Sequence, residues 1–131
     1  MKAPVWVLDE TVLAFHEQLL ALHGGATGLR DRGLLESALA RPRNLFVYEQ
    51  ATVFALAASY AFGLVKNHPF VDGNKRIGFA VGVLFLELNG LRFEAEEADA
   101  AVQTLGLAAG AIKEAEYAAW LRANSRRVRT E

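Results

Sequence analysis

The sequence contains no cysteine, and this absence removes several kinds of chemistry at once. Disulfide bonds, thiolate nucleophiles and cysteine-based zinc sites are all excluded. Net charge is also nearly absent, because 14 Lys and Arg residues stand against 15 Asp and Glu residues, leaving −1. A dedicated nucleic-acid-binding domain is normally strongly basic, so we expect no direct binding of nucleic acid.

Long hydrophobic runs are missing as well. The longest apolar stretch, residues 77–86, has about half the length that a membrane-spanning helix needs. The first ten residues carry one lysine and a short apolar run before Asp9, which does not fit a secretory signal. We therefore expect a cytoplasmic protein that does not associate with membranes.

The composition suits one all-α domain. The chain has 131 residues, 53% of them hydrophobic, with alanine the commonest residue and only three prolines. This is enough to build a single core over residues 1–131. Helical patterns are expected over residues 10–23 (after an Asp9 N-cap), 33–40, 52–67, 74–89, 96–109 and 114–124, with Leu91–Phe93 extended, residues 42–50 a loop or small hairpin after Pro42, and a frayed basic tail over residues 125–131.

Two of these helices, 52–67 and 74–89, are apolar on nearly every side, so we expect them to be buried at the centre. Gly78 and Gly82, four residues apart, predict close packing of the second helix against the first. His16 and His23 lie seven residues apart on one helical stripe. A metal site there is one interpretation, and histidines at the edge of the core are the favoured one, because no third ligand is evident.

A polar loop, HPFVDGNKR at residues 68–76, joins the two apolar helices and carries most of the candidate chemistry. Gly73 and Asn74 stand where the second helix begins, and unpaired backbone N–H groups at a helix start bind anions. Lys75 and Arg76 oppose the helix dipole, a conflict that a bound polyphosphate would remove. Asp72 offers hard oxygen ligands for Mg²⁺.

Two further side chains of the loop have distinct expected roles. Histidine exchanges a proton near neutral pH, so His68 is a candidate base for an attacking hydroxyl. Phe70 lies between polar neighbours and is expected to anchor the loop in the core. A simple turn would also use such residues singly, but all of them together at this spacing favour a functional loop.

The same run resembles the signature of the Fic/Doc superfamily, H-[PI]-F-x-[DE]-[GA]-N-[GK]-R. The lysine at position 75 is typical of the death-on-curing (Doc) branch rather than of AMP-transferring Fic enzymes. Residues 28–42, with Gly28–Asp31 reading GLRD, and residues 84–90 are similar to segments of that branch. The resemblance covers about residues 8–110.

Family membership implies an activity and its parts. Doc-like proteins are toxins of type II toxin–antitoxin systems, and the best known one transfers a phosphoryl group from ATP to elongation factor Tu, arresting translation. By resemblance, His68 is the general base and Asp72 holds Mg²⁺. The backbone around Gly73 cradles the phosphates of ATP. The backbone of Asn74 and Lys75 shares that role, and Asn74, Lys75 and Arg76 stabilise the charge that develops during transfer. Lys66 is a weaker candidate for a phosphate contact.

The resemblance also implies partners. Residues 42–50 correspond to the family's flap, which aligns the target peptide by strand-like pairing, with Leu45, Phe46, Val47 and Tyr48 along its edge. The inhibitory motif of many Fic enzymes, [ST]-x-x-x-E-[GN], does not occur in the sequence. Inhibition is therefore expected from a separate antitoxin chain that lays a helix into a groove of this domain.

Two alternatives remain open. The first is AMP transfer by the same loop. AMP-transferring relatives carry a second arginine where this chain has Phe79, and glycine in place of Lys75, and both differences argue against that reaction. Ile77 replaces the usual threonine, a change expected to perturb the start of the second helix slightly. The second alternative is a catalytically idle helical module that only binds a partner.

Overall fold

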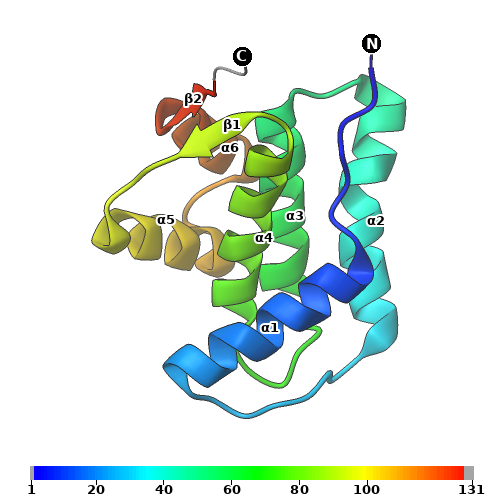
Figure 1. Ribbon diagram of the computed structural model, residues 1–131, viewed down its shortest axis with the longest axis vertical. Helices are drawn as coiled ribbons and strands as arrows, with labels where there is room; N and C mark the ends of the chain where they lie inside the picture. The colour runs from blue at the N-terminus through cyan, green and yellow to red at the C-terminus, as the bar shows by residue number, and fades with distance from the viewer. Residues whose placement is uncertain (1, 129–131) are drawn as a thin grey trace.

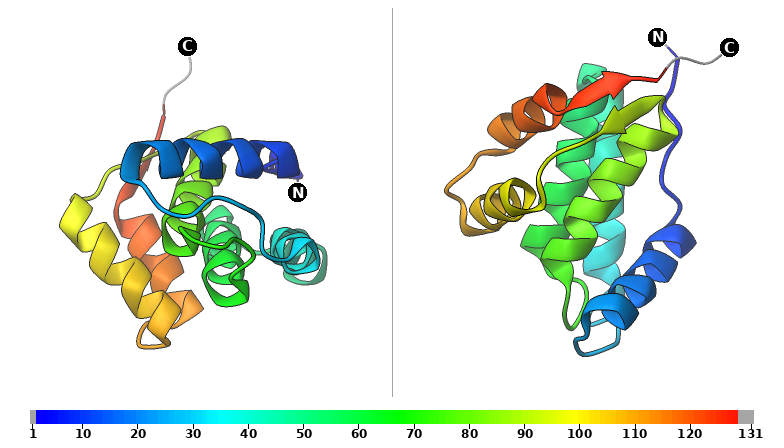
Figure 2. Two further views of the ribbon diagram at one scale, coloured as in Figure 1. Left: turned by 90° about the horizontal axis from the view of Figure 1, so that it is seen from below. Right: turned by 60° about the vertical axis from the view of Figure 1, so that its left-hand side comes forward.

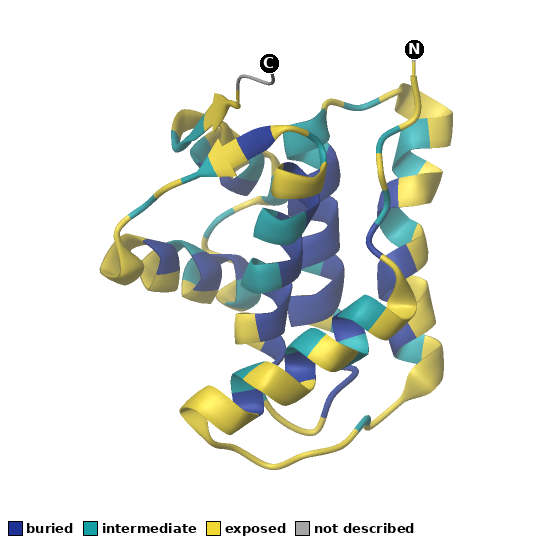
Figure 3. Ribbon diagram, viewed as in Figure 1, coloured by how far each residue is buried: buried dark blue, intermediate teal, exposed yellow. Residues whose placement is uncertain are grey.

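Two apolar helices form the centre of the fold, α3 (Val53–Asn67) and α4 (Asn74–Leu88). The structure is a computed structural model that describes residues 2–128, and over that range the chain forms six helices and two short strands (Figure 1). α3 begins where the Thr52 side chain accepts a hydrogen bond from the Ala55 N–H. Buried residues concentrate on α3 and on the side of α4 that faces it (Figure 3). The expectation of a central buried pair in an all-α domain is confirmed.

The close packing of α3 and α4 depends on glycine in α4, as the sequence predicts. A Cβ atom on Gly78 would lie 2.8 Å from Cγ1 of Val65 and 3.1 Å from the carbonyl oxygen of Ala61. A Cβ atom on Gly82 would lie 3.2 Å from the Ala57 oxygen. All three distances are too short for an ordinary contact, so α4 can approach α3 this closely only with glycine at these positions.

The largest departure from the sequence prediction is α2 (Arg32–Glu49), which continues through Pro42. The predicted stop at Pro42 and the predicted loop or hairpin over residues 42–50 are both wrong. Proline inside a helix removes one backbone hydrogen bond, but its fixed φ fits a helix. Pro42 is buried, and α2 packs along α3, so tertiary packing offsets that loss.

The apolar residues 45–48 show no helical period in the sequence, because only two of these four consecutive side chains face inward. Leu45 and Phe46 are half-buried, and Phe46 meets the ring of Trp6 edge to face at 5.9 Å. Val47 and Tyr48 are exposed. The end of α2 that carries these residues lies at the opposite end of the bundle from the 68–73 loop (Figure 1).

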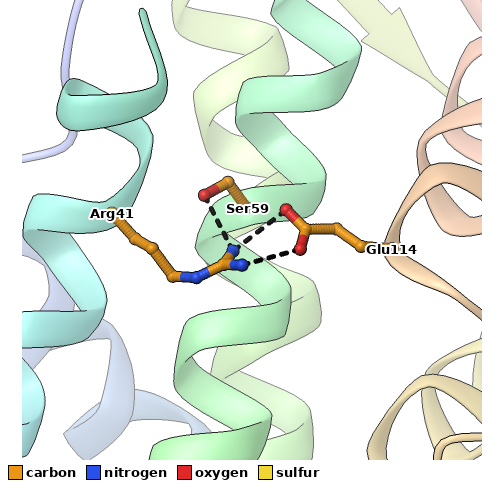
Figure 4. A network of polar contacts seen from close by, with 3 residues as sticks. All are labelled: Arg41, Ser59 and Glu114. Atoms are coloured by element: carbon orange, nitrogen blue, oxygen red, sulfur yellow. Dashed lines mark hydrogen bonds and ion pairs between the residues drawn. The ribbon is translucent and has the colours of Figure 1, made fainter. Parts of the chain in front are cut away.

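A three-residue network links α2 to α6 (Glu114–Ala123) across α3 (Figure 4). The guanidinium of Arg41 donates to both carboxylate oxygens of Glu114, at 2.9 and 2.8 Å, and to Oγ of Ser59 at 3.1 Å. The same guanidinium lies 4.6 Å from the ring centre of Phe62. This forked geometry fixes the spacing of two helices that otherwise touch little.

The remaining elements surround the central pair. α1 (Asp9–His23) crosses beside the start of α4, and its N-cap is Leu8, so the expected Asp9 cap is wrong (Figure 2). α5 (Glu97–Ala109) packs against both α3 and α4. β1 (Leu91–Phe93) pairs antiparallel with β2 (Ser125–Arg127). The tail predicted to be frayed therefore forms a strand over residues 125–127, while Arg129 and the residues after it lie outside the described range.

No helix within residues 2–128 has both the length and the apolar character needed to cross a membrane.

Candidate functional site

The loop between α3 and α4 is bounded by two residues in the left-handed conformation. His68 ends α3 with φ 54° and ψ 52°, and Gly73 precedes α4 with φ 77° and ψ 17°. No side chain caps the start of α4. The first-turn N–H groups of a helix have no partner inside the helix, so those of α4 are available to an anion.

The side chain of Asn74 holds the loop from within. Its Oδ1 accepts from the Phe70 N–H at 3.0 Å, and its Nδ2 donates to the Phe70 carbonyl at 2.9 Å. Nδ2 also lies 3.1 Å from Nδ1 of His68. Asn74 is buried, so its side chain supports the loop and only its backbone N–H remains for a phosphate.

Phe70 anchors the loop in the core, as the sequence predicts. It is buried, and its ring stacks on His16 of α1 with ring centres 3.7 Å apart. Nε2 of His16 donates to the carbonyl oxygen of Asp72 at 2.8 Å. His16 is therefore a core histidine that supports the loop. Within residues 2–128 no three His, Asp or Glu side chains gather to form a metal site, so the metal interpretation of His16 and His23 is not supported.

The chain between α1 and α2, residues 24–31, runs alongside the loop, and the sequence analysis missed this contact. Leu29 and Phe70 form an isolated antiparallel bridge. The N–H groups of Arg30 and Asp31 donate to the Pro69 carbonyl at 2.7 and 3.0 Å. Residues 24–31 therefore form the strand-like segment beside the loop. Residues 42–49 are helical and belong to α2, so the assignment of a flap to residues 42–50 is wrong. The signal of the strand-like segment in the sequence was the GLRD run at Gly28–Asp31.

Asp72 presents an ionised carboxylate beside the start of α4. Its Oδ2 accepts from the Ala26 N–H at 3.2 Å and its Oδ1 from the Gly73 N–H at 2.8 Å. These two hydrogen bonds, first that of Ala26, lower the pKa of the Asp72 carboxyl, and the nearby Arg76 cation adds to the effect.

The site fits Mg²⁺ held together with a nucleotide. The Asp72 carboxylate is exposed and keeps lone pairs free for a cation. Mg²⁺ usually takes one or two carboxylates and completes its shell with water and substrate phosphates. One carboxylate beside an uncapped helix start matches that pattern.

A cleft of about 650 Å³ opens above the loop, which is within the usual size range of small-molecule sites. Its polar floor comes from the loop and the first turn of α4, and an apolar wall comes from α1, α4 and α5. The floor residues are His68, Asp72, Gly73, Asn74, Lys75 and Arg76. The wall includes Leu19, Phe79, Ala80, Ala100, Ala101 and Leu105.

The structure does not bring every predicted residue to this cleft. Nζ of Lys66 donates to the Ala108 carbonyl at 3.0 Å, at the end of α5, and does not line the cleft. Leu45 through Tyr48 are at the far end of α2 (Figure 1). Ile77 is fully buried in the core. Phe79 does line the cleft, where its ring meets those of Phe93 and Trp120 at 5.8 and 6.4 Å.

The site therefore belongs to a helical domain whose central loop brings a histidine, a carboxylate and an uncapped helix start to one cleft. The model of the Fic/DOC family matches residues 6–86, and the chain belongs to the Fic/DOC family. The chain is also similar to Toxin Doc of Mycolicibacterium smegmatis, with 39% identity over 82 residues. That match spans 56% of this chain and 58% of the relative's own length.

Proposed function

We propose that this protein transfers a phosphoryl group from ATP, bound with Mg²⁺, to a hydroxyl group of a translation factor. The observation that carries the proposal is the floor of the cleft, where His68, the Asp72 carboxylate and the open start of α4 meet. Catalysis of phosphoryl transfer is mainly positioning and charge stabilisation, and the floor offers both.

Each floor residue has a role in this proposal. The backbone N–H groups at the start of α4, with Lys75 and Arg76, bind the phosphates and stabilise the charge that develops during transfer. Asp72 would hold the Mg²⁺ ion, which would neutralise negative charge on the phosphates. The target hydroxyl attacks the terminal phosphorus as the bond to the bridging oxygen breaks, and ADP leaves. His68 receives the hydroxyl proton.

The contact with Asn74 bears on that proton step. Because Asn74 donates to Nδ1 of His68, the neutral ring at rest carries its proton on Nε2. To accept a proton at Nε2, the ring must first carry its own proton on Nδ1. The hydrogen bond from Asn74 to Nδ1 must then break through movement of the His68 ring, because Phe70 holds the Asn74 amide in place.

Phe79 favours phosphoryl transfer over AMP transfer. Phe79 lines the cleft and packs on Phe93 and Trp120, so no guanidinium is present where AMP-transferring relatives have one. Lys75 fills a position that is glycine in those enzymes. AMP transfer would break the bond at the α-phosphorus instead and release pyrophosphate.

The biological setting is proposed from the relative. A Doc-type toxin of the cytoplasm would arrest translation by modifying elongation factor Tu, and a separate antitoxin chain would neutralise it. The absence of an inhibitory [ST]-x-x-x-E-[GN] motif agrees with control by a second chain. Lys66 has no role in this proposal, because its ammonium group donates to the Ala108 carbonyl at the end of α5.

The test is to incubate the purified protein with Mg-ATP and elongation factor Tu and to weigh the intact factor. We expect a gain of one phosphoryl group, lost with His68→Ala and with Asp72→Ala. Lys66→Ala is the control and should retain the activity. An adenylyl gain would replace the proposal by AMP transfer. No gain on this factor or on any protein of a translation extract would favour the idle binding module.

A further inference from the structure

The GLRD segment contributes a side chain to the loop that the proposed chemistry does not use. The Arg30 guanidinium lies at the end of α3, where Nε donates to the His68 carbonyl at 2.7 Å and an Nη donates to the Asn67 carbonyl at 3.0 Å. These are the final carbonyls of α3 and its C-cap, which lack helical partners. A cation there also complements the negative end of the helix dipole.

The residue that Arg30 holds is in an unfavourable backbone conformation. His68 has a φ of 54°, and it is not a glycine. L-residues rarely adopt this region, because Cβ crowds the following carbonyl. Pro69 also disfavours the right-handed helical region for the residue before it, so the relaxed alternative for His68 is an extended conformation. An extended His68 would direct its imidazole away from its present place in the cleft.

Arg30 is itself fixed to the same loop. Its backbone N–H and that of Asp31 donate to the Pro69 carbonyl, and Leu29 bridges to Phe70. The backbone of this segment therefore hydrogen-bonds to the residues just after His68. The Arg30 side chain hydrogen-bonds to the carbonyl of His68 itself. Asn74 contacts the His68 ring itself, at Nδ1.

We propose that Arg30 is a positioning residue for His68, which it keeps in the left-handed conformation that points the imidazole into the cleft. Arg30 does not itself line the cleft, and its side chain reaches the cleft floor only through the His68 carbonyl, so it acts through His68. The kinetic consequence rests on the proposed function, whereas the conformational consequence does not.

The first test reads the conformation without any substrate. NMR spectra of the full chain should show a strong intraresidue HN–Hα contact for His68, the mark of a positive φ. We expect Arg30→Ala to weaken this contact and to move the ring signals of His68. Arg32→Ala is the matched control, because Arg32 is an exposed arginine two residues further along. An unchanged His68 signal in Arg30→Ala would overturn the proposal, whether or not the protein is a kinase.

The second test reads catalysis. Arg30→Ala should lower kcat for phosphoryl transfer by about 10- to 100-fold, the scale expected when a reacting group is displaced by about 1 Å. KM for ATP should change by less than about twofold, because Asp72 and the start of α4 keep their own supports. Arg30→Lys supplies one ammonium for two carbonyls and should recover part of kcat.

The two tests separate failure of this inference from failure of the proposed function. A change at His68 with no kinase activity in the unmodified protein would leave Arg30 as a positioning residue and reject the kinase. Equal kcat in the unmodified protein and Arg30→Ala would reject the positioning role. A rise in KM for ATP with unchanged kcat would assign Arg30 to nucleotide binding instead, which also overturns the inference.

Discussion

Asn74 faces Nδ1 of His68 with a donor group, at 3.1 Å. The orientation of its amide is fixed because Phe70 supplies an N–H to Oδ1 and a carbonyl to Nδ2. One buried amide thus sets both the path of the loop and the tautomer of the histidine that it carries.

The tautomer of His68 can be measured directly. In the free protein at a pH where the ring is neutral, ¹⁵N NMR should show the proton of His68 on Nε2, because Nδ1 accepts from Asn74. Asn74→Ala should let both tautomers appear and should also loosen the loop at Phe70. His23, which is exposed, serves as the internal reference. A His68 ring protonated on Nδ1 in the free protein would contradict the donor role of Asn74.

Asp72 should stabilise the fold in a pH-dependent way. Its pKa in the folded protein lies below its ordinary value of 3.8, so the ionised form favours the folded state. That contribution is complete above the ordinary pKa and is lost as the pH falls through the lower folded value. The difference in unfolding free energy between the unmodified protein and Asp72→Asn, from urea titrations, should therefore shrink as the pH is lowered from about 6 to about 3. Glu87→Gln, which changes an exposed carboxylate, is the control.

Gly78→Ala should destabilise the protein by about 1 to 3 kcal/mol, since the added methyl group overpacks the contact with Val65 and Ala61. Gly106→Ala is the comparison. There the added group meets only the side chain of Ile112, whose flexible end can move. Thermal and urea unfolding should show the larger loss for Gly78→Ala. Equal losses would mean that α3 and α4 can separate without cost.

The Arg41–Glu114 pair should contribute about 1 kcal/mol or less, because its side chains are 40% and 27% exposed and water screens the charges. Glu114→Gln should remove most of this contribution at low salt and change little at about 1 M salt. Glu94 forms ion pairs with Arg92 and Arg126, and all three side chains are more than half exposed, so Glu94→Gln should change stability less. Urea unfolding at the two salt concentrations measures both. A loss for Glu114→Gln that does not depend on salt would point to packing rather than charge.

Tyr117 should weaken the fold at alkaline pH. Burial raises its pKa to about 12, while its hydrogen bond with Thr104 lowers it by a smaller amount. A raised pKa means that its stabilising effect is complete below the ordinary value of 10 and is lost as the pH rises toward the folded value. Two pKa units correspond to about 3 kcal/mol as an upper limit. Tyr117→Phe should be less stable at pH 8 but should lose less stability between pH 9 and about 11.5. An equal loss of stability in both proteins over this pH range would exclude Tyr117 as the cause of the alkaline destabilisation.

The sequence predicted the centre of the fold and most of the candidate site because both leave local patterns. α3 and α4 are apolar on nearly every side, and the loop residues are contiguous, so composition and spacing sufficed. Phe70 was found as an anchor because it stands alone among polar neighbours. Gly78 and Gly82 were found because small residues four apart mark a close helix contact.

The errors arose where distant packing decides local structure. Pro42 stays inside α2 because that helix packs along α3, and no pattern near residue 42 shows it. β2 is three residues long, and its pairing partner lies more than 30 residues earlier in the chain. The hydrogen bond from Arg30 to His68 joins residues 38 positions apart in the chain. The sequence therefore identified Arg30 as part of a motif but did not show its partner.

The contacts near the two ends of the described chain have a practical consequence. The N–H of Val5 donates to Oδ1 of Asn89, and the N–H of Val128 donates to the carbonyl of the next residue, Gly90. Both ends therefore meet at one turn, where α4 stops, and the length of α4, about 22 Å, separates that turn from the loop at residues 68–73. A fluorescent reporter or a tether to a solid support, joined before Val5 or after Val128, would start on the side of the molecule away from the cleft.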